Sequence, residues 1–141
     1  MIVTAAWTLL LLLTLAPEKP LDSCALALWA VGQAPKPDQL DIEVLALQER
    51  ATLPARQVFH DPDSTIWLRP LPNGEFALAL INRSSRPVSP DVVWNELGIL
   101  KERGDSPRLR DVLTRENLGK VHGGFSRRLD PGQCAIYRVK P

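Results

Sequence analysis

Residues 65–84 read Thr-Ile-Trp-Leu-Arg-Pro-Leu-Pro-Asn-Gly-Glu-Phe-Ala-Leu-Ala-Leu-Ile-Asn-Arg-Ser. Two apolar runs, Ile66–Leu71 and Phe76–Ile81, flank the turn sequence Pro72-Asn73-Gly74. Asn and Gly tolerate positive φ at low cost, which a tight hairpin turn requires. The stretch therefore predicts a β-hairpin.

The second run of this hairpin is apolar on both faces. Side chains of a strand alternate between two faces, so the run places Phe76, Leu78 and Leu80 on one side and Ala77, Ala79 and Ile81 on the other. A strand that is apolar on both faces is buried on both sides. We expect the large residues to point into a sandwich core and the smaller ones to lie under a closely packed neighbour.

Bulk composition narrows the class of protein. The 141 residues fit one ordinary domain with a leader, far short of the roughly 250 residues of a (β/α)8 barrel. The chain has 17 Lys and Arg residues and 16 Asp and Glu residues, so its charge is nearly balanced. This balance creates no overall positive electrostatic field that would favour binding of nucleic acid. Thirteen prolines favour short strands joined by turns over long helices.

The first 21 residues form an apolar leader. The run Ala5–Ala16 is too short to span a bilayer stably but suits the apolar core of a secretory signal, with Thr14 and Ala16 as small residues before a cleavage point. Secretion or delivery to a lysosomal-type lumen would follow from such a signal. The alternative is the apolar beginning of a truncated or rearranged open reading frame.

Residues 22–56 predict one or two helices and a linker. Cys24–Ala34 is apolar almost all round, with Asp22 and Ser23 available as N-caps and Pro35 as a stop. Leu40–Gln48 has apolar residues at helical spacing. We expect these helices to pack loosely or not at all, because the chain offers them little partner structure.

Residues 57–141 predict a mainly β domain, an antiparallel sandwich of seven or eight short strands. The expected strands are Gln57–His60, the two hairpin strands, Val88–Trp94, Arg108–Leu113, Lys120–His122, Gly124–Leu129 and Gln133–Lys140. Asn95–Gly98 predicts one helical turn closed by glycine, Leu100–Ser106 a polar connection, and Thr114–Gly119 a further turn.

Three stretches in the same order resemble the C-terminal β-sandwich domain of family 27 glycoside hydrolases, the α-galactosidases and α-N-acetylgalactosaminidases. They are the hairpin with its Ile81-Asn82-Arg83-Ser84 end, Leu109-Arg110-Asp111-Val112-Leu113 with Glu116-Asn117-Leu118-Gly119, and Asp130-Pro131-Gly132 with Ala135-Ile136-Tyr137-Arg138-Val139. Upstream, Leu26–Val31 resembles the family's last barrel helix, and Glu43–Glu49 resembles the segment that leaves the barrel. Lys36–Gln39 stands where an apolar barrel strand is expected, so the resemblance implies a degenerate barrel remnant.

The resemblance implies no catalytic residue in this chain. The family's two catalytic carboxylates lie on barrel strands, and the "lysine-tyrosine-aspartate" stretch before the nucleophile has no counterpart here. Asp61 and Asp63 flank Pro62 in a sequence that favours a turn. His60 and His122 lack a Gly-x-Ser-x-Gly elbow that would support nucleophilic catalysis.

Other side chains have a structural and a functional interpretation. Cys24 and Cys134 are too few and too widely spaced for a disulfide framework or zinc site, so we expect buried or free thiols and no metal or cofactor. Trp67 and Trp94 favour the core over a sugar platform. Arg108, Arg110, Arg127 and Arg128 favour solvated strand edges over a basic patch. Asn82-Arg83-Ser84 is an N-glycosylation sequon.

Two functional hypotheses follow. The first is a non-catalytic C-terminal domain, or truncated product, resembling those of α-galactosidases, which hydrolyse terminal α-galactosides. Its partner would be a (β/α)8 catalytic domain, or a second copy bound through an uncovered apolar sheet face. The second is a secreted carbohydrate-binding or protein-interaction module with an exposed aromatic face.

Overall fold

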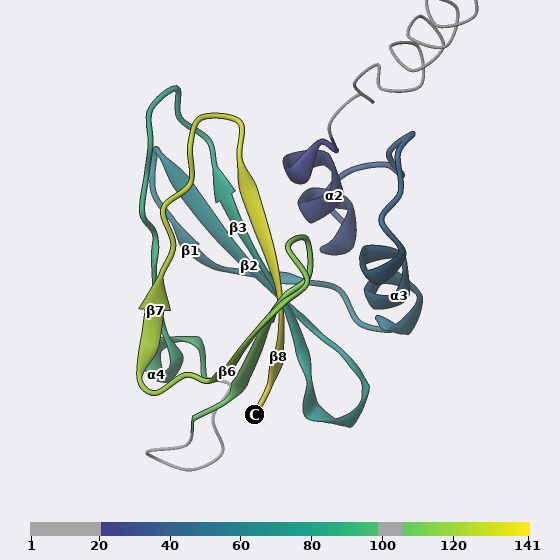
Figure 1. The fold of residues 1–141 in the computed structure, drawn as a ribbon, viewed down its shortest axis with the longest axis vertical. Coiled ribbons are helices and arrows are strands. Elements are labelled where there is room, and N and C mark those ends of the chain that lie inside the picture. Colours follow the sequence, from purple (N-terminus) through teal and green to yellow (C-terminus); the bar gives the residue numbers. More distant parts are fainter. Residues whose placement is uncertain (1–20, 99–105) are drawn as a thin grey trace, which may run out of the picture.

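The computed structural model describes residues 21–98 and 106–141 (Figure 1). The predicted leader and the connection before Ser106 lie outside these residues. The helices are α2 (Ser23–Ala30), α3 (Ile42–Arg50) and the single turn α4 (Trp94–Leu97). The strands are β1 (Arg56–His60), β2 (Ser64–Pro70), β3 (Phe76–Asn82), β4 (Asp91–Val93), β5 (Arg108–Asp111), β6 (Glu116–Lys120), β7 (Gly124–Ser126) and β8 (Cys134–Lys140).

The strands form two antiparallel sheets. One has six strands in the order β1-β2-β3-β8-β5-β6, and the other pairs β4 with β7. The antiparallel bridge between Val88 and Leu129 lies close to the small sheet. Figure 1 shows the small sheet facing the large one on the side opposite the helices. The predicted mainly β sandwich is confirmed.

The hairpin that dominates the sequence joins β2 to β3 at the centre of the large sheet. Its register runs without interruption from Ser64↔Asn82 to Pro70↔Phe76. Asn73 and Gly74 adopt φ values of 64° and 72°, and the Leu71 N–H donates to the Glu75 carbonyl at 2.8 Å to close the turn. Asn and Gly reach this left-handed conformation at the lowest cost, so the turn prediction is confirmed.

The sandwich core lies between the two sheets. Leu78 and Leu80 of β3 are fully buried there, while Phe76 packs at its border. Trp94 and Tyr137 are the largest fully buried side chains, and the Phe125 ring lies between them, 5.6 Å and 4.9 Å from their ring centroids. Alternation along β3 and β8 thus directs the predicted residues into this core.

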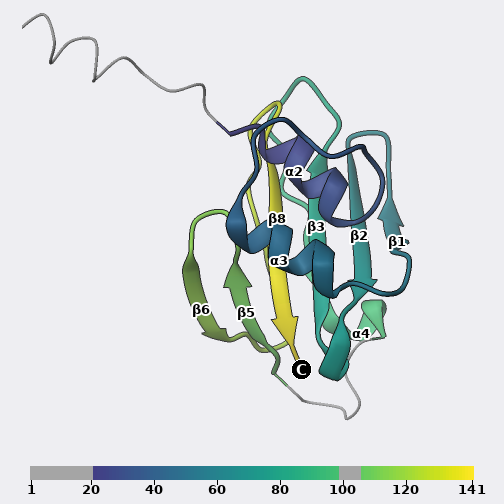
Figure 2. The ribbon, with the colours of Figure 1, turned by 90° about the vertical axis from the view of Figure 1, so that its right-hand side faces the viewer.

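A helical layer covers the opposite face of the large sheet (Figure 2). Leu26, Ala27 and Ala30 of α2 are almost fully buried, and they share one apolar cluster with Ala77 and Ala79 of β3. Alanine side chains leave room for a helix to approach the sheet closely. The prediction that the helices pack loosely or not at all is wrong, because α2 is buried against the hairpin's small-residue face. The apolar face of the sheet, which we expected to be uncovered, is therefore covered by α2.

Local signals start both long helices where the sequence offers acidic caps. The Asp22 carboxylate accepts the N–H groups of Cys24 and Ala25, and the Asp41 carboxylate accepts those of Glu43 and Val44. These bonds satisfy donors that the first helical turn leaves unpaired. The Arg69 guanidinium then joins the layers by donating to the Ala30 carbonyl at 3.0 Å and to the Leu53 carbonyl at 2.9 Å.

Several predicted boundaries are wrong. The expected strand Lys120–His122 keeps only Lys120, as the end of β6, and the expected strand Gly124–Leu129 is reduced to β7. The predicted turn Thr114–Gly119 contains most of β6, which pairs with β5 from Glu116 onward. Its polar sequence lacks the apolar alternation of a buried strand because this edge strand is exposed along its whole length. The expected strand Val88–Trp94 is reduced to β4, since Trp94 already begins α4.

Candidate functional site

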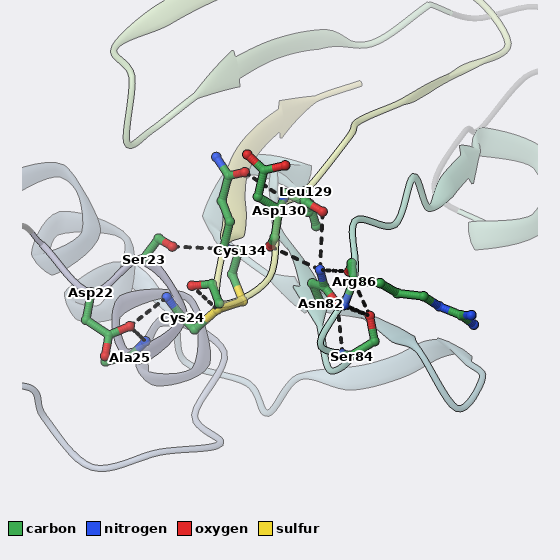
Figure 3. The surroundings of a disulfide bond; sticks show 12 residues. Asp22, Ser23, Cys24, Ala25, Asn82, Ser84, Arg86, Leu129, Asp130 and Cys134 are labelled. Atoms are coloured by element: carbon green, nitrogen blue, oxygen red, sulfur yellow. Dashed lines mark hydrogen bonds between the residues drawn. A yellow bond between two sulfur atoms is a disulfide. The ribbon is translucent and has the colours of Figure 1, made fainter.

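A disulfide joins the helical layer to the sandwich (Figure 3). Cys24 lies in the first turn of α2 and Cys134 begins β8, with an S–S distance of 1.99 Å and a Cα–Cα distance of 4.8 Å. The Cys134 N–H also donates to the Ser23 hydroxyl at 3.0 Å. The prediction of buried or free thiols is wrong, because folding brings together two positions that are 110 residues apart in sequence. Two cysteines alone carried no signal for this pairing.

Ion pairs continue the connection along α3. The buried Glu75 carboxylate lies 2.6 Å from Arg50 of α3, 2.8 Å from Arg138 of β8 and 3.5 Å from Lys140. Burial, the largest influence, raises the pKa of Glu75, but hydrogen bonds and charge from Arg50 and Arg138 outweigh it, so its pKa falls below 4.5. Glu75 is therefore held as an anion at neutral pH.

A second group of ion pairs lies at the start of α3. Glu43 accepts from Arg110 of β5 at 2.7 Å and lies 3.2 Å from Arg115, which also contacts the buried Asp41 at 3.0 Å. Hydrogen bonding to Arg110 is the main influence that lowers the pKa of Glu43. These ion pairs fix the helix against the sheet, and the lowered pKa of Glu43 is the opposite of what a general acid needs.

Asn82, the predicted glycosylation residue, is almost fully buried at the end of β3. Its Nδ2 donates to the carbonyls of Arg86, Leu129 and Asp130 at 3.0, 3.2 and 3.0 Å, and its Oδ1 accepts from the Ser84 N–H (Figure 3). A glycan would replace one Nδ2 hydrogen and would require space at that atom. Glycosylation stays a prediction, and a glycan at Nδ2 would displace at least one of these three contacts in the folded chain.

The two candidate catalytic aspartates belong to the turn between β1 and β2. Asp61 accepts the N–H groups of Asp63 and Ser64, both at 2.7 Å, and Asp63 forms an ion pair with Arg86 at 2.5 Å. Backbone hydrogen bonds from Ser64, then Asp63, lower the pKa of Asp61. Both line an open hollow of about 570 Å³, but the lowered pKa of Asp61 is the opposite of what a glycosidase acid needs.

The histidines are not brought together. His60 Nδ1 lies 3.2 Å from the Arg83 guanidinium, whereas His122 Nδ1 lies 3.1 Å from the Ser106 hydroxyl. Within residues 21–98 and 106–141, His122 has no carboxylate partner that would orient it in a Ser-His-Asp arrangement. The same residues contain no group of three or more potential metal ligands. None of their helices is long and apolar enough to cross a membrane.

The aromatic and basic candidates lie mostly in structural positions. Trp94 is fully buried and its Nε1–H donates to the Val121 carbonyl at 2.9 Å, while Trp67 is half-buried against the helical layer. Arg127 bonds to Asp111 at 2.7 Å and to the Tyr137 hydroxyl at 3.0 Å. Arg110 is paired with Glu43, whereas Arg108 and Arg128 are exposed. The described aromatic residues thus form no exposed Trp or Tyr platform.

Comparison with known proteins identifies the sandwich. The family described as the alpha galactosidase C-terminal beta sandwich domain matches residues 61–139. The chain belongs to this family. Its residues 61–139 are homologous to the C-terminal domains of α-galactosidases, and residues 21–98 and 106–141 contain no (β/α)8 barrel.

The relatives of this sandwich are longer proteins. The α-galactosidase of Cyamopsis tetragonoloba is 25% identical in an alignment of 130 residues that covers 82% of this chain and 31% of that protein. A glycoside hydrolase family 27 β-L-arabinopyranosidase of Geobacillus stearothermophilus superimposes with a TM-score of 0.70 and 23% identity over 82% of this chain and 29% of its own. A putative α-galactosidase/melibiase of Bacteroides fragilis superimposes with a TM-score of 0.68 and 20% identity. That match covers 87% of this chain and 29% of the Bacteroides protein.

These matches extend beyond the sandwich. Coverage of 82% or more exceeds what the chain from β1 to its last residue supplies, so the aligned parts also include residues upstream of β1. At these identities the structural matches show a shared fold alone. The shared fold therefore includes part of the region upstream of β1.

Proposed function

We propose that this chain is a non-catalytic support domain of the α-galactosidase C-terminal type and hydrolyses no glycoside on its own. The observation that carries the proposal is the match of residues 61–139 to the sandwich domain of enzymes of which this chain spans about 30%. The pKa values of Glu43, Asp61 and Glu75 are all lowered, whereas the general acid of a retaining glycosidase needs a raised pKa. Its cellular context would be carbohydrate metabolism.

An assay with a nitrophenyl α-galactoside tests this proposal directly. The purified full chain is expected to give no turnover above buffer, with the Cyamopsis tetragonoloba α-galactosidase as a positive control. Measurable turnover that co-purifies with the chain and disappears in an Asp61→Asn/Asp63→Asn variant would overturn the proposal. The same variant should remain folded, which circular dichroism verifies.

The outer surface of the helical layer supports a partner of the barrel type. Leu40, Ile42 and Leu53 are 40%, 76% and 55% exposed on or beside α3. Apolar side chains gathered outside a packed layer are typical of an interface between domains. We place a (β/α)8 partner there rather than on the sheet, whose apolar face the helices already cover.

The disulfide supports an oxidising location. Disulfides persist in secreted and lumenal proteins and are rare in reducing compartments. We therefore favour the signal interpretation of Met1–Ala16 and a secreted or lysosomal-type lumenal protein, with residues 22–56 and 57–141 as its helical and sandwich parts. Expression in a secretory cell followed by intact mass measurement tests this. The secreted chain should lack the leader, whereas a chain that stays in the cytosol and still begins at Met1 would contradict the proposal.

The carbohydrate-binding module is the weaker candidate. Trp29, Trp94 and Tyr137 have 8%, 0% and 1% exposed surface, so they present no stacking face for a sugar. Titration with galactose is expected to leave tryptophan fluorescence unchanged. A saturable shift would favour the module over the support domain.

A further inference from the structure

A basic hollow lies on the part of the large sheet that the helices leave uncovered. Figure 2 shows β5 and β6 to one side of α2 and α3, on the face that the helices share. The hollow has a volume of about 390 Å³. It is lined by Arg108, Leu109, Arg110, Asn117, Gly119, Arg138 and Lys140, none of which carries a carboxylate.

Three cations lie side by side across the strands at this end of the sheet. The register pairs Arg108 of β5 with Lys140 of β8 on one side and with Lys120 of β6 on the other. Directly opposed residues of antiparallel strands lie about 4.5–5.5 Å apart at their Cα atoms. Like charges in such positions repel and destabilise the sheet. The row therefore has a cost that folding alone does not explain.

The adjacent row shows how this sheet neutralises its cations elsewhere. Arg110 and Arg138 are also paired across β5 and β8, but Glu43 and Glu75 hold them at 2.7 and 2.8 Å. Among the described residues, Lys140 is the one member of the outer row with an acidic neighbour, Glu75 at 3.5 Å, and Glu75 already bonds to Arg50 and Arg138.

Charged groups without partners line the hollow or lie next to it; Lys120 does not line the hollow itself but follows Gly119, which does. Within residues 21–98 and 106–141, no ion-pair partner is found for Arg108 or Lys120. Arg138 also lines the hollow, but its one donor without an acceptor, the Nε–H, is buried. An anion placed here would therefore meet charges that the described part of the chain leaves unpaired.

Protection of a sheet edge explains only part of the row. Lysine on an exposed edge strand discourages pairing with another chain, and Lys120 of β6 fits that role. Arg108 and Lys140 lie on β5 and β8, which are inner strands with neighbours on both sides. Their positive charge is not needed to protect an edge.

We propose that the row Lys140–Arg108–Lys120 and its hollow bind the phosphate or sulfate group of an anionic small molecule. A guanidinium presents a planar fork to such an oxyanion, and ammonium groups add point charges on either side. The volume of about 390 Å³ lies within the range of small-molecule sites, so it also holds part of the molecule that carries the group. The site is independent of the proposed absence of glycosidase activity.

Calorimetric titration of the full chain tests the site, with sodium pyrophosphate and sucrose octasulfate as probes at constant ionic strength. Arg108→Gln and Lys120→Gln each remove one charge of the row. Arg128→Gln removes an equally positive side chain that is 71% exposed outside the hollow and serves as the matched control. Unfolding midpoints establish that each variant is folded. If Arg108→Gln does not fold, Lys120→Gln decides the test.

We expect the wild-type chain to bind at least one probe, and each row variant to weaken that dissociation constant tenfold or more. Arg128→Gln should change it less than twofold. Binding of pyrophosphate alone assigns a phosphate group, and binding of the octasulfate alone assigns a sulfated sugar; either supports the site. Absence of binding of both probes at 10 mM overturns the proposal. It is also overturned if Arg128→Gln loses as much affinity as the row variants, because binding would then reflect overall positive charge.

Discussion

Cys24 and Cys134 form a covalent bond between the first turn of α2 and the first residue of β8, across 110 residues of sequence. The bond lies at one end of an apolar interface in which α2 covers Ala77 and Ala79 of the central hairpin strand. It therefore holds the helical layer on the sheet when the packing between them fluctuates. This connection joins the helices covalently to the sandwich.

Reduction should accordingly destabilise the whole chain. Closing a loop of about 100 residues restricts the unfolded chain and stabilises the fold by about 2–5 kcal/mol. Urea unfolding with and without a phosphine reductant measures the difference. The Cys24→Ser/Cys134→Ser variant should match the reduced protein and should not respond to reductant. Equal urea midpoints for oxidised and reduced wild type would contradict this stabilising role of the disulfide.

Ala79 tests the close approach of the helix to the sheet. Ala79→Leu adds volume to a fully buried position under α2, and overpacking of this kind costs about 1–3 kcal/mol. Ala46→Leu makes the same change at an exposed position of α3 and should alter the unfolding free energy by less than about 0.5 kcal/mol. If both variants have the same stability, the helical layer is not packed on β3 in solution.

Glu75 should give stability a dependence on acid pH. Its folded-state pKa lies below 4.5, so ionised Glu75 stabilises the fold above the unfolded-state pKa, and this contribution is lost as pH falls through the folded-state pKa. Glu75→Gln is expected to cost about 1–2 kcal/mol at pH 7, because its cationic partners are partly exposed and screened.

The matched control for Glu75 is Glu49→Gln, which removes an exposed carboxylate from α3. Unfolding free energies measured from pH 3 to pH 7 should show that the gap between wild type and Glu75→Gln narrows below about pH 4.5. The gap for Glu49→Gln should remain near zero throughout. A Glu75→Gln gap that is constant over this range would refute the assigned ion pairs.

Asn82 should matter more for its hydrogen bonds than for its sequon. Asn82→Asp replaces the amide that donates to three carbonyls with a carboxylate that repels them, at a cost of about 2–4 kcal/mol. Ser84→Ala also abolishes the sequon but keeps that amide, so it should cost less than half as much. Thermal unfolding of unglycosylated protein measures both, and equal losses would show that the three bonds contribute little.

The hairpin shows how much the sequence by itself determined. Asn73 and Gly74 select the turn, and strict alternation after Phe76 assigns each side chain of β3 to a face, because both signals act between residues close in the chain. Together with two later motifs they also determined the family that matches residues 61–139. The N-caps Asp22 and Asp41 set the starts of α2 and α3 in the same local way.

Tertiary structure alone decided which distant residues contact these elements. The partner of Cys24, the cations around Glu75 and the cross-strand row at Arg108 all depend on segments far apart in sequence. The polar strand β6 likewise became a strand through pairing with β5, against its own weak pattern. Local propensities encode turns, caps and faces, whereas pairing, charge neutralisation and the cover of the sheet arise only when the chain closes on itself.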